Sequence, residues 1–232
     1  MIDIVALHGN REVEAFVLAH GADPATELAT RGWSGRALSA TRGSSDDLTI
    51  TYAVDACAPV LTRAGSGVAH DDGLAAADLA NVVPYQRIAA YAVVRSSRGI
   101  LMTELSARTN AEGLWNLPGG GLDPGEDPTD AVVREVHEET GQHVVDVALL
   151  TVMTRHWVGR APNGRVEDFH AVRLFHAAHC PEPTDPVVLD VGGSTSAARW
   201  MPETELTSLP LASSVPEALA VAGVPGQSAL NP

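Results

Sequence analysis

Three glutamates near the middle of the chain have the spacing of a metal-binding helix face. Glu135, Glu138 and Glu139 stand at i, i+3 and i+4 of an expected helix over Thr129–Thr140, so their carboxylates share one face. Like charges at this spacing repel, and Arg134 is the one basic residue beside them. A divalent cation would relieve the repulsion, and Mg²⁺ prefers such oxygen ligands while keeping substrate phosphates in its shell. The pattern therefore predicts a magnesium-type site.

The segment before these glutamates is suited to close contact with a ligand. Gly119, Gly120 and Gly121 allow backbone conformations that other residues avoid, and they sit in an expected loop over Pro118–Pro128. Glu126 lies just before the helix, within reach of the helix N-terminus or of Arg134. A glycine-rich loop followed by an acidic helix is thus the positioning framework that the sequence predicts.

The whole segment resembles the Nudix box, Gly-x5-Glu-x7-Arg-Glu-U-x-Glu-Glu-x-Gly-U, where U is a bulky aliphatic residue. The match runs from Gly120 to Gly141, and the single departure is Gln142, where an aliphatic residue is usual. Gln142 follows the helix, so the departure concerns local packing and leaves the carboxylates in place. Similar flanking features extend the resemblance over about residues 87 to 220. A long motif of fixed spacing is a specific signal.

The resemblance implies an α/β fold, an α/β/α sandwich around a mixed sheet. It also implies metal-dependent hydrolysis of a phosphoanhydride bond in a nucleoside diphosphate-linked substrate, with Mg²⁺ or Mn²⁺ as the cofactor. The implied metal ligands are the carboxylates of Glu135, Glu138 and Glu139 and the Gly120 carbonyl. Glu138 or Glu139 would also orient or deprotonate the attacking water, and Glu126 would pair with Arg134 to fix the loop to the helix.

Several alternatives stay open at this stage. The substrate could be a nucleoside triphosphate or an ADP-ribose-like compound. A non-catalytic Nudix-like domain that senses nucleotides is the alternative outside enzymes, since a fold does not fix a function. A general base outside the box is not identifiable, although Glu167, Asp168 and Asp190 are candidates. Trp157, expected at the end of a strand next to a loop over Gly159–Gly164, is the best candidate for stacking on a base.

The composition limits the partners. The 232 residues include 29 acidic and 15 basic side chains, a net charge of −14 that argues against long nucleic acid or an anionic membrane. Every basic residue other than histidine is an arginine, so any contact of that kind with phosphate uses a guanidinium. Two cysteines give no disulfide or zinc-finger pattern, and no apolar stretch approaches the roughly 20 residues of a membrane span. We expect a cytoplasmic protein with a small nucleotide substrate, and a homodimer stays open.

The chain divides into four expected parts, which are residues 1–57, 58–84, 85–224 and 225–232. The first is a small α/β unit, the second a linker with one helical turn, the third the catalytic domain and the fourth a flexible tail. Within the first part, we expect strands at Ile2–Leu7, Leu38–Thr41 and Leu48–Val54 and helices at Arg11–His20 and Asp23–Thr30. Within the third, we expect strands at Ile88–Val94, Ile100–Leu105, Val144–Met153, Phe169–Ala177 and Ala198–Met201, and a closing helix at Val215–Val221.

Overall fold

The chain folds into two units, and each unit combines distant parts of the sequence. The computed structural model describes residues 1–43, 46–61, 68–75, 78–79, 82–161 and 164–226. The first unit comprises Met1–Ile88 and Val152–Arg173, and the second comprises Ala89–Thr151 and Leu174–Pro232. The expected division at residues 58–84 stays a prediction, and the expected tail lies largely outside the described residues.

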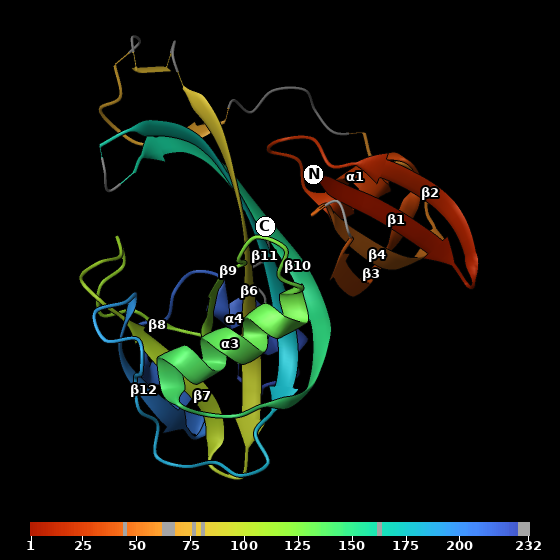
Figure 1. Cartoon of the computed structure of the whole chain (residues 1–232). Helices are drawn as coiled ribbons and strands as arrows, with labels where there is room; N and C mark the ends of the chain where they lie inside the picture. The colour runs from red at the N-terminus through yellow and green to blue at the C-terminus, as the bar shows by residue number, and fades with distance from the viewer. Residues whose placement is uncertain (44–45, 62–67, 76–77, 80–81, 162–163, 227–232) are drawn as a thin grey trace. The chain divides into compact units, whose positions relative to one another are not determined.

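The first unit contains a four-stranded mixed sheet in the order β2-β1-β4-β3 (Figure 1). Strands β1 and β4 are parallel, whereas the other two pairs are antiparallel. Buried residues alternate along β1, as Ile2, Ile4 and Ala6 show, so one face of the sheet forms the core of this unit. Its elements are β1 (Ile2–His8), β2 (Arg11–Val17), α1 (Pro24–Thr30), β3 (Trp33–Arg42) and β4 (Leu48–Ala56).

The helix expected over Arg11–His20 is wrong, because β2 occupies this segment and pairs antiparallel with β1. The expected helix relied on Val13, Phe16, Val17 and His20 as one face, but Val13, Ala15 and Val17 also stand at every second position, as in a strand. The preceding turn contains Gly9, whose φ of +60° suits a tight hairpin. The turn and the neighbouring strand edge therefore decide in favour of a strand.

A larger sheet has the order β12-β7-β6-β11-β10-β5, with β8 paired to β7 and β9 paired to β6. Strands β7, β8, β9 and β12 belong to the second unit, and β5 belongs to the first. Strands β6, β10 and β11 are long and contribute residues to both units. The strands are β5 (Ala69–His70), β6 (Val83–Ser96), β7 (Gly99–Leu105), β8 (Trp115–Asn116), β9 (Gly119–Gly121), β10 (Val145–Arg160), β11 (Val166–His179) and β12 (Thr195–Met201).

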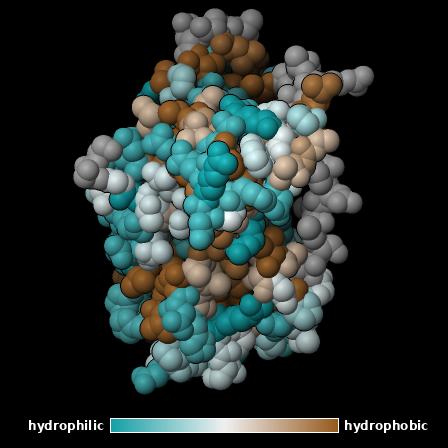
Figure 2. Space-filling view, turned by 90° about the vertical axis from the view of Figure 1, so that its right-hand side faces the viewer, coloured by the Kyte–Doolittle hydropathy of each residue, from teal (hydrophilic) through white to brown (hydrophobic). Residues whose placement is uncertain are grey.

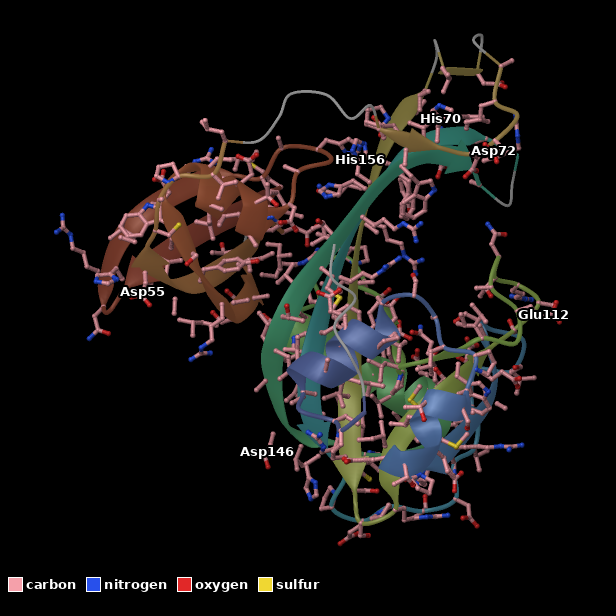
Figure 3. All side chains as sticks on the ribbon, turned by 180° about the vertical axis from the view of Figure 1, so that it is seen from behind. Asp55, His70, Asp72, Glu112, Asp146 and His156 are labelled. Carbon is pink, nitrogen blue, oxygen red and sulfur yellow. The ribbon has the colours of Figure 1, made fainter. Side chains whose placement is uncertain are left out.

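Helices cover both faces of this sheet. Helix α3 (Pro128–Thr140) lies in front of the strands in Figure 1, and α4 (Val215–Val221) lies on the opposite face, as the reverse view in Figure 3 agrees. A short 3₁₀ helix, η1 (Glu203–Ser208), follows β12. Helix α3 buries Val132 and Val136, and α4 buries Ala218 and Leu219. The expected α/β class, with a mixed sheet between helices and a separate small N-terminal sheet, is confirmed.

Four local expectations need correction. The expected loop over Pro118–Pro128 contains the short strand β9, which pairs with β6. The expected linker contains β5, which pairs with β10 in parallel. Strand β10 continues to Arg160, so Trp157 lies within a strand and not at its end, and the expected loop over Gly159–Gly164 begins later. The helical turn expected in the linker falls partly outside the described residues.

Hydrophilic residues are interspersed with smaller groups of hydrophobic ones on the face in Figure 2. Within the described part of the chain, no helix is long and apolar enough to cross a membrane.

Candidate active site

Helix α3 presents the three predicted carboxylates, and local signals fix its ends. The Asp127 side chain accepts a hydrogen bond from the Thr129 N–H and caps the start, while Gly141, with φ +68°, ends the helix in the left-handed conformation. The glutamates differ in exposure, since the side chain of Glu138 is 47% exposed and that of Glu135 is 15% exposed. Glu139 is buried, with 5% exposed. The three carboxylates on this helix face therefore range from buried to half-exposed.

Glu139 is held by groups from two other elements. Its Oε2 accepts a hydrogen bond from the Gly119 N–H at 2.9 Å, and its Oε1 accepts one from Thr195 Oγ1 at 2.5 Å and a longer one from Ser194 Oγ at 3.4 Å. Burial raises the pKa of Glu139 to about 7, although the hydrogen bonds from Thr195 and Gly119 act in the opposite direction. The side chain is therefore fixed in place and poised near neutral pH.

Thr195 and Ser194 were not predicted from the sequence. They lie 56 and 55 positions from Glu139 along the chain, at and just before the start of β12, respectively. A hydroxyl residue at the start of a strand is ordinary, so nothing in the local pattern marks these two as partners of a carboxylate.

The glycines of β9 allow the backbone to lie directly against Glu135. A Cβ atom added at Gly120 would come within 2.4 Å of Glu135 Oε1. At Gly119, with φ +145°, it would meet the Ala90 carbonyl oxygen at 2.2 Å. Burial also raises the pKa of Glu135 above its usual value, against the opposing effect of Arg134. The expected reason for glycine here, close approach of the backbone to the site, agrees with this geometry.

Arg134 links the loop to the acidic face. It makes the expected ion pair with Glu126 in a two-pronged arrangement, with Nε 2.7 Å from Oε1 and Nη2 2.8 Å from Oε2. Its Nη1 also donates to Glu135 at 2.9 Å and to Glu138 at 3.1 Å, and its Nη2 donates to the Gly121 carbonyl. The hydrogen bonds that Arg134 donates to Glu126 raise the pKa of the guanidinium, so the cation is permanent. Arg134 therefore relieves part of the repulsion that the spacing implied.

Gln142, the one departure from the Nudix box, ties a loop to the end of α3. It is 2% exposed, its side-chain amide donates to Thr184 Oγ1 at 2.9 Å, and its Oε1 accepts from the Thr184 N–H at 2.9 Å. Further along this loop, the N–H groups of Leu189 and Asp190 donate to the Glu138 carbonyl. The loop leads into Ser194 and Thr195, so the polar residue anchors the segment that delivers the partners of Glu139.

A cavity of about 450 Å³ adjoins this loop. Its lining includes Thr195, which also bonds Glu139, together with Ser106, Val191 and the guanidinium-bearing Arg108. The cavity is thus connected to the buried carboxylate through one shared side chain.

The other sequence candidates lie elsewhere. Glu167 and Asp168 belong to the first unit, where Asp168 pairs with His20 and His156. Asp190 is exposed and contacts α3 through its backbone. Trp157 packs against Phe169 with ring centroids 4.5 Å apart, an internal contact of the first unit. Among the described residues, none of these side chains forms a hydrogen bond or ion pair with the carboxylates of Glu135, Glu138 or Glu139.

The donor set fits a hard divalent cation. The three carboxylates lie on one face of α3, and the Gly120 backbone lies so close to Glu135 that an added Cβ would meet its carboxylate. Oxygen donors of this kind suit Mg²⁺ or Mn²⁺. Arg134 compensates only part of their charge, because it is shared with Glu126.

Comparison with known proteins agrees with this geometry. The sequence profile of the NUDIX domain matches residues 85–220, which is more than half of the chain. The chain belongs to the Nudix family. It is 33% identical over 111 residues to an RNA pyrophosphohydrolase of Rhodopseudomonas palustris, covering 41% of this chain and 60% of that protein. It is 30% identical over 115 residues to a putative ADP-ribose pyrophosphatase of Bacillus subtilis, covering 48% of this chain and 51% of that protein.

Among solved structures, a MutT Nudix hydrolase from Burkholderia pseudomallei aligns with a TM-score of 0.47 and 29% identity, over 59% of this chain and 97% of that one. The chain spans less than two thirds of the length of these curated relatives. The matched Nudix region contains α3 and the carboxylate cluster, whereas residues 1–84 lie outside it.

Proposed function

We propose that this Nudix protein hydrolyses a phosphoanhydride bond in a nucleoside diphosphate-linked compound, with Mg²⁺ or Mn²⁺ as the cofactor. The observation that carries the proposal is the cluster of Glu135, Glu138 and Glu139 against the glycines of β9. Glu139 is buried there with a pKa raised to about 7, and such a costly group is expected where it serves chemistry.

The cation would be held by the carboxylates of Glu135, Glu138 and Glu139 and by the Gly120 carbonyl. When bound, it supplies positive charge that stabilises the negative charge developing on the phosphoryl oxygens. The depth of Glu139 and its hydrogen bonds to Gly119 and Thr195 keep one ligand rigid, whereas Glu138 faces solvent. A rigid, buried ligand (Glu139) together with an exposed one (Glu138) suits a site where substrate binds and product leaves.

The protein's own residues orient the reaction. The oxygen of a water molecule forms a bond to phosphorus while the anhydride P–O bond breaks. The leaving phosphate group takes the electron pair of that bond. Glu138, the exposed carboxylate, is placed to accept the proton that the water loses. Arg134 and Glu126 act as positioning residues, because their ion pair fixes the glycine-rich segment to α3. The proton later returns to solvent or to a phosphate product.

The substrate class rests on charge, size and relatives. The names of the two relatives describe a pyrophosphohydrolase of RNA and a pyrophosphatase of ADP-ribose, and both names refer to hydrolysis of a phosphoanhydride bond. The net charge of −14 favours a small nucleotide over long nucleic acid. The cavity beside Thr195 has a volume within the range usual for small-molecule sites, and Arg108 offers a guanidinium to a phosphate there. A cytoplasmic location, where such nucleotides are abundant, belongs to the same proposal.

The test is a substrate panel with Mg²⁺ or Mn²⁺ in ¹⁸O-labelled water. The panel contains nucleoside triphosphates, ADP-ribose and a short triphosphorylated RNA, and products are identified by mass. We expect cleavage of at least one compound, with ¹⁸O on a phosphate product. Label found only on a ribose carbon would contradict attack at phosphorus.

Two variants make the test specific to the cluster. We expect Glu138→Gln to lower turnover by on the order of 10²-fold, since a lost ligand or base removes several kcal/mol of transition-state stabilisation. The matched control is Asp130→Asn, which neutralises an exposed carboxylate on the first turn of the same helix and should leave turnover unchanged. A protein that binds nucleotides tightly and cleaves none would overturn the proposal in favour of the nucleotide sensor.

A further inference from the structure

A second group of metal-binding side chains lies in the first unit and takes no part in the chemistry proposed above. We propose that His20, His156 and Asp168, with His170 as the fourth ligand, bind one Zn²⁺ ion. One candidate ligand atom from each of the first three residues lies within 4.8 Å of the other two. Figure 3 labels His156 on β10. This inference stands independently of the proposed hydrolase activity.

The imidazole rings have the mutual spacing that a shared ion would give. Ring centroids lie 5.3 Å apart for His20 and His156, 5.4 Å for His20 and His170, and 6.1 Å for His156 and His170. Two imidazoles on one tetrahedral Zn²⁺, with Zn–N bonds of about 2.1 Å, have centroids roughly 5 to 6 Å apart. The ring centroids therefore have the spacing that a shared ion requires, whereas the ligand atoms of His170 would have to move closer to the group formed by His20, His156 and Asp168.

Asp168 supplies the carboxylate of this group. Its Oδ1 lies 2.5 Å from His156 Nε2 and 3.4 Å from His20 Nε2. Two ligand atoms of a tetrahedral zinc site are about 3.4 Å apart, so the second distance fits and the first lengthens by about 1 Å on binding. In the metal-free chain His156 and Asp168 are in direct hydrogen-bond contact, and the ion would take the place of this contact.

His170 gives an independent sign that a ligand belongs here. The residue is 0% exposed, its Nδ1 is hydrogen-bonded to the Gln86 amide at 2.9 Å, and its Nε2 is buried without a hydrogen-bond partner. The Ala22 backbone is close enough to influence the ring but does not meet hydrogen-bond geometry at Nε2. The side chain of Gln86 can present its oxygen to Nδ1–H, which leaves Nε2 free to coordinate a metal. A buried ring nitrogen without a partner is unfavourable unless something binds it.

The surroundings hold these side chains in place. Gly21, with φ +77°, packs so closely on the His156 ring that a Cβ there would come within 2.4 Å of Nδ1. Two residues later, Asp23 Oδ2 accepts a hydrogen bond from Thr154 Oγ1 on β10 at 2.8 Å. The segment between β2 and α1 is thus fixed against β10, and the ion would add a stronger link at the same place.

The donor set favours zinc over magnesium. Three neutral imidazoles and one carboxylate form a nitrogen-rich, four-ligand set, which suits Zn²⁺, whereas Mg²⁺ prefers oxygen. The side chains of His20, His156 and Asp168 are between 22% and 28% exposed, so an ion can enter from solvent. Binding involves no redox change.

The experiment uses the full chain, stripped of metal with a chelator and dialysed. Zn²⁺ affinity is measured by competition with a chromophoric chelator in excess Mg²⁺, which occupies the carboxylate cluster of α3. Zinc content after desalting gives the stoichiometry. We expect one tightly bound Zn²⁺ per chain in the wild type. We expect His20→Ala and His156→Gln to weaken Zn²⁺ binding by on the order of 10²-fold, because each removes a direct ligand.

The matched control is His70→Ala, which removes an exposed imidazole from β5 in the same unit (Figure 3). This variant should bind zinc as the wild type does. Far-UV circular dichroism checks folding, and the exposed position of His20 makes its variant the one least dependent on packing. Zn²⁺ affinity that is equal in wild type and His20→Ala would overturn the site and leave a hydrogen-bonded contact only. Undiminished affinity in His170→Gln would overturn the four-ligand arrangement.

Discussion

Replacing Glu139 with glutamine should make the metal-free protein more resistant to rising pH while abolishing its activity. Burial raises the pKa of Glu139 from 4.5 to about 7, so between these values the folded chain retains a proton that the unfolded chain has lost. The stability from this group is therefore fully present below pH 4.5 and is lost as pH rises through 7. The full shift, about 2.5 pH units, corresponds to roughly 3 kcal/mol.

The practical window is narrower, because the isoelectric point of about 4.9 brings aggregation near that pH. Between pH 5.5 and pH 8, the wild type should lose about 2 kcal/mol of unfolding free energy through Glu139. Glu139→Gln should lose none by this route. The amide nitrogen of the new side chain adds a constant cost of about 1 to 2 kcal/mol if it lacks a partner. That cost cancels when each protein is compared with itself at two pH values.

The assay is urea denaturation with a chelator present at pH 5.5, 6.5 and 8, on wild type, Glu139→Gln and the helix control Asp130→Asn. Turnover at saturating Mg²⁺ is measured beside it and should fall by on the order of 10²-fold in Glu139→Gln alone. Mg²⁺ should raise the unfolding free energy of the wild type and not of Glu139→Gln. A pH dependence shared equally by wild type and Glu139→Gln would refute the reasoning from burial. Full turnover in Glu139→Gln would refute the ligand role.

Three further perturbations test the framework around this residue. Glu126→Gln should reduce both turnover and thermal stability, the latter by about 1 to 2 kcal/mol, because it breaks the two-pronged pair with Arg134; unchanged melting would contradict this. Gly120→Ala should raise the Mg²⁺ concentration needed for half-maximal activity, because the new Cβ displaces the Glu135 carboxylate, and an unshifted titration would show that the contact is unimportant. A chain that begins at Val82 should keep α3 and its sheet; circular dichroism of an unfolded chain would show that the expected domain division is wrong.

Local signals in the sequence were sufficient for helix α3 and its carboxylates. The cap at Asp127, the terminal Gly141 and the i, i+3, i+4 spacing of the glutamates all act within a few residues, so no knowledge of distant contacts was needed. The pairing of Arg134 with Glu126 followed for the same reason, because one turn of helix and a short loop separate them.

Contacts between distant segments were not predictable. Thr195 reaches Glu139 only because β12 lies in the sheet beside α3, and His20 meets His156 only because a loop near the N-terminus packs on β10. Strand β2 was missed for a related reason: its residues fit a helical and a two-residue period equally, and the edge of β1 decided between them. Trp157 was misplaced because nothing in its own neighbourhood shows that β10 continues past it.

The two donor sets differ in what they cost the metal-free fold, and this difference argues for different roles. Glu139 is buried as a carboxylate whose ionised form the fold disfavours, so the chain is less stable near neutral pH for keeping it. That arrangement makes sense where the charge is used in a reaction, and a core amide or hydrophobic residue would otherwise be preferred. His20, His156 and His170 are neutral when they coordinate, and Asp168 is already paired, so the cost of the second set is confined to the buried Nε2 of His170, which has no hydrogen-bond partner. The first set has only oxygen donors, which Mg²⁺ prefers, and the second has mostly nitrogen donors, which Zn²⁺ prefers. Each site can therefore be filled with its metal and tested without the other.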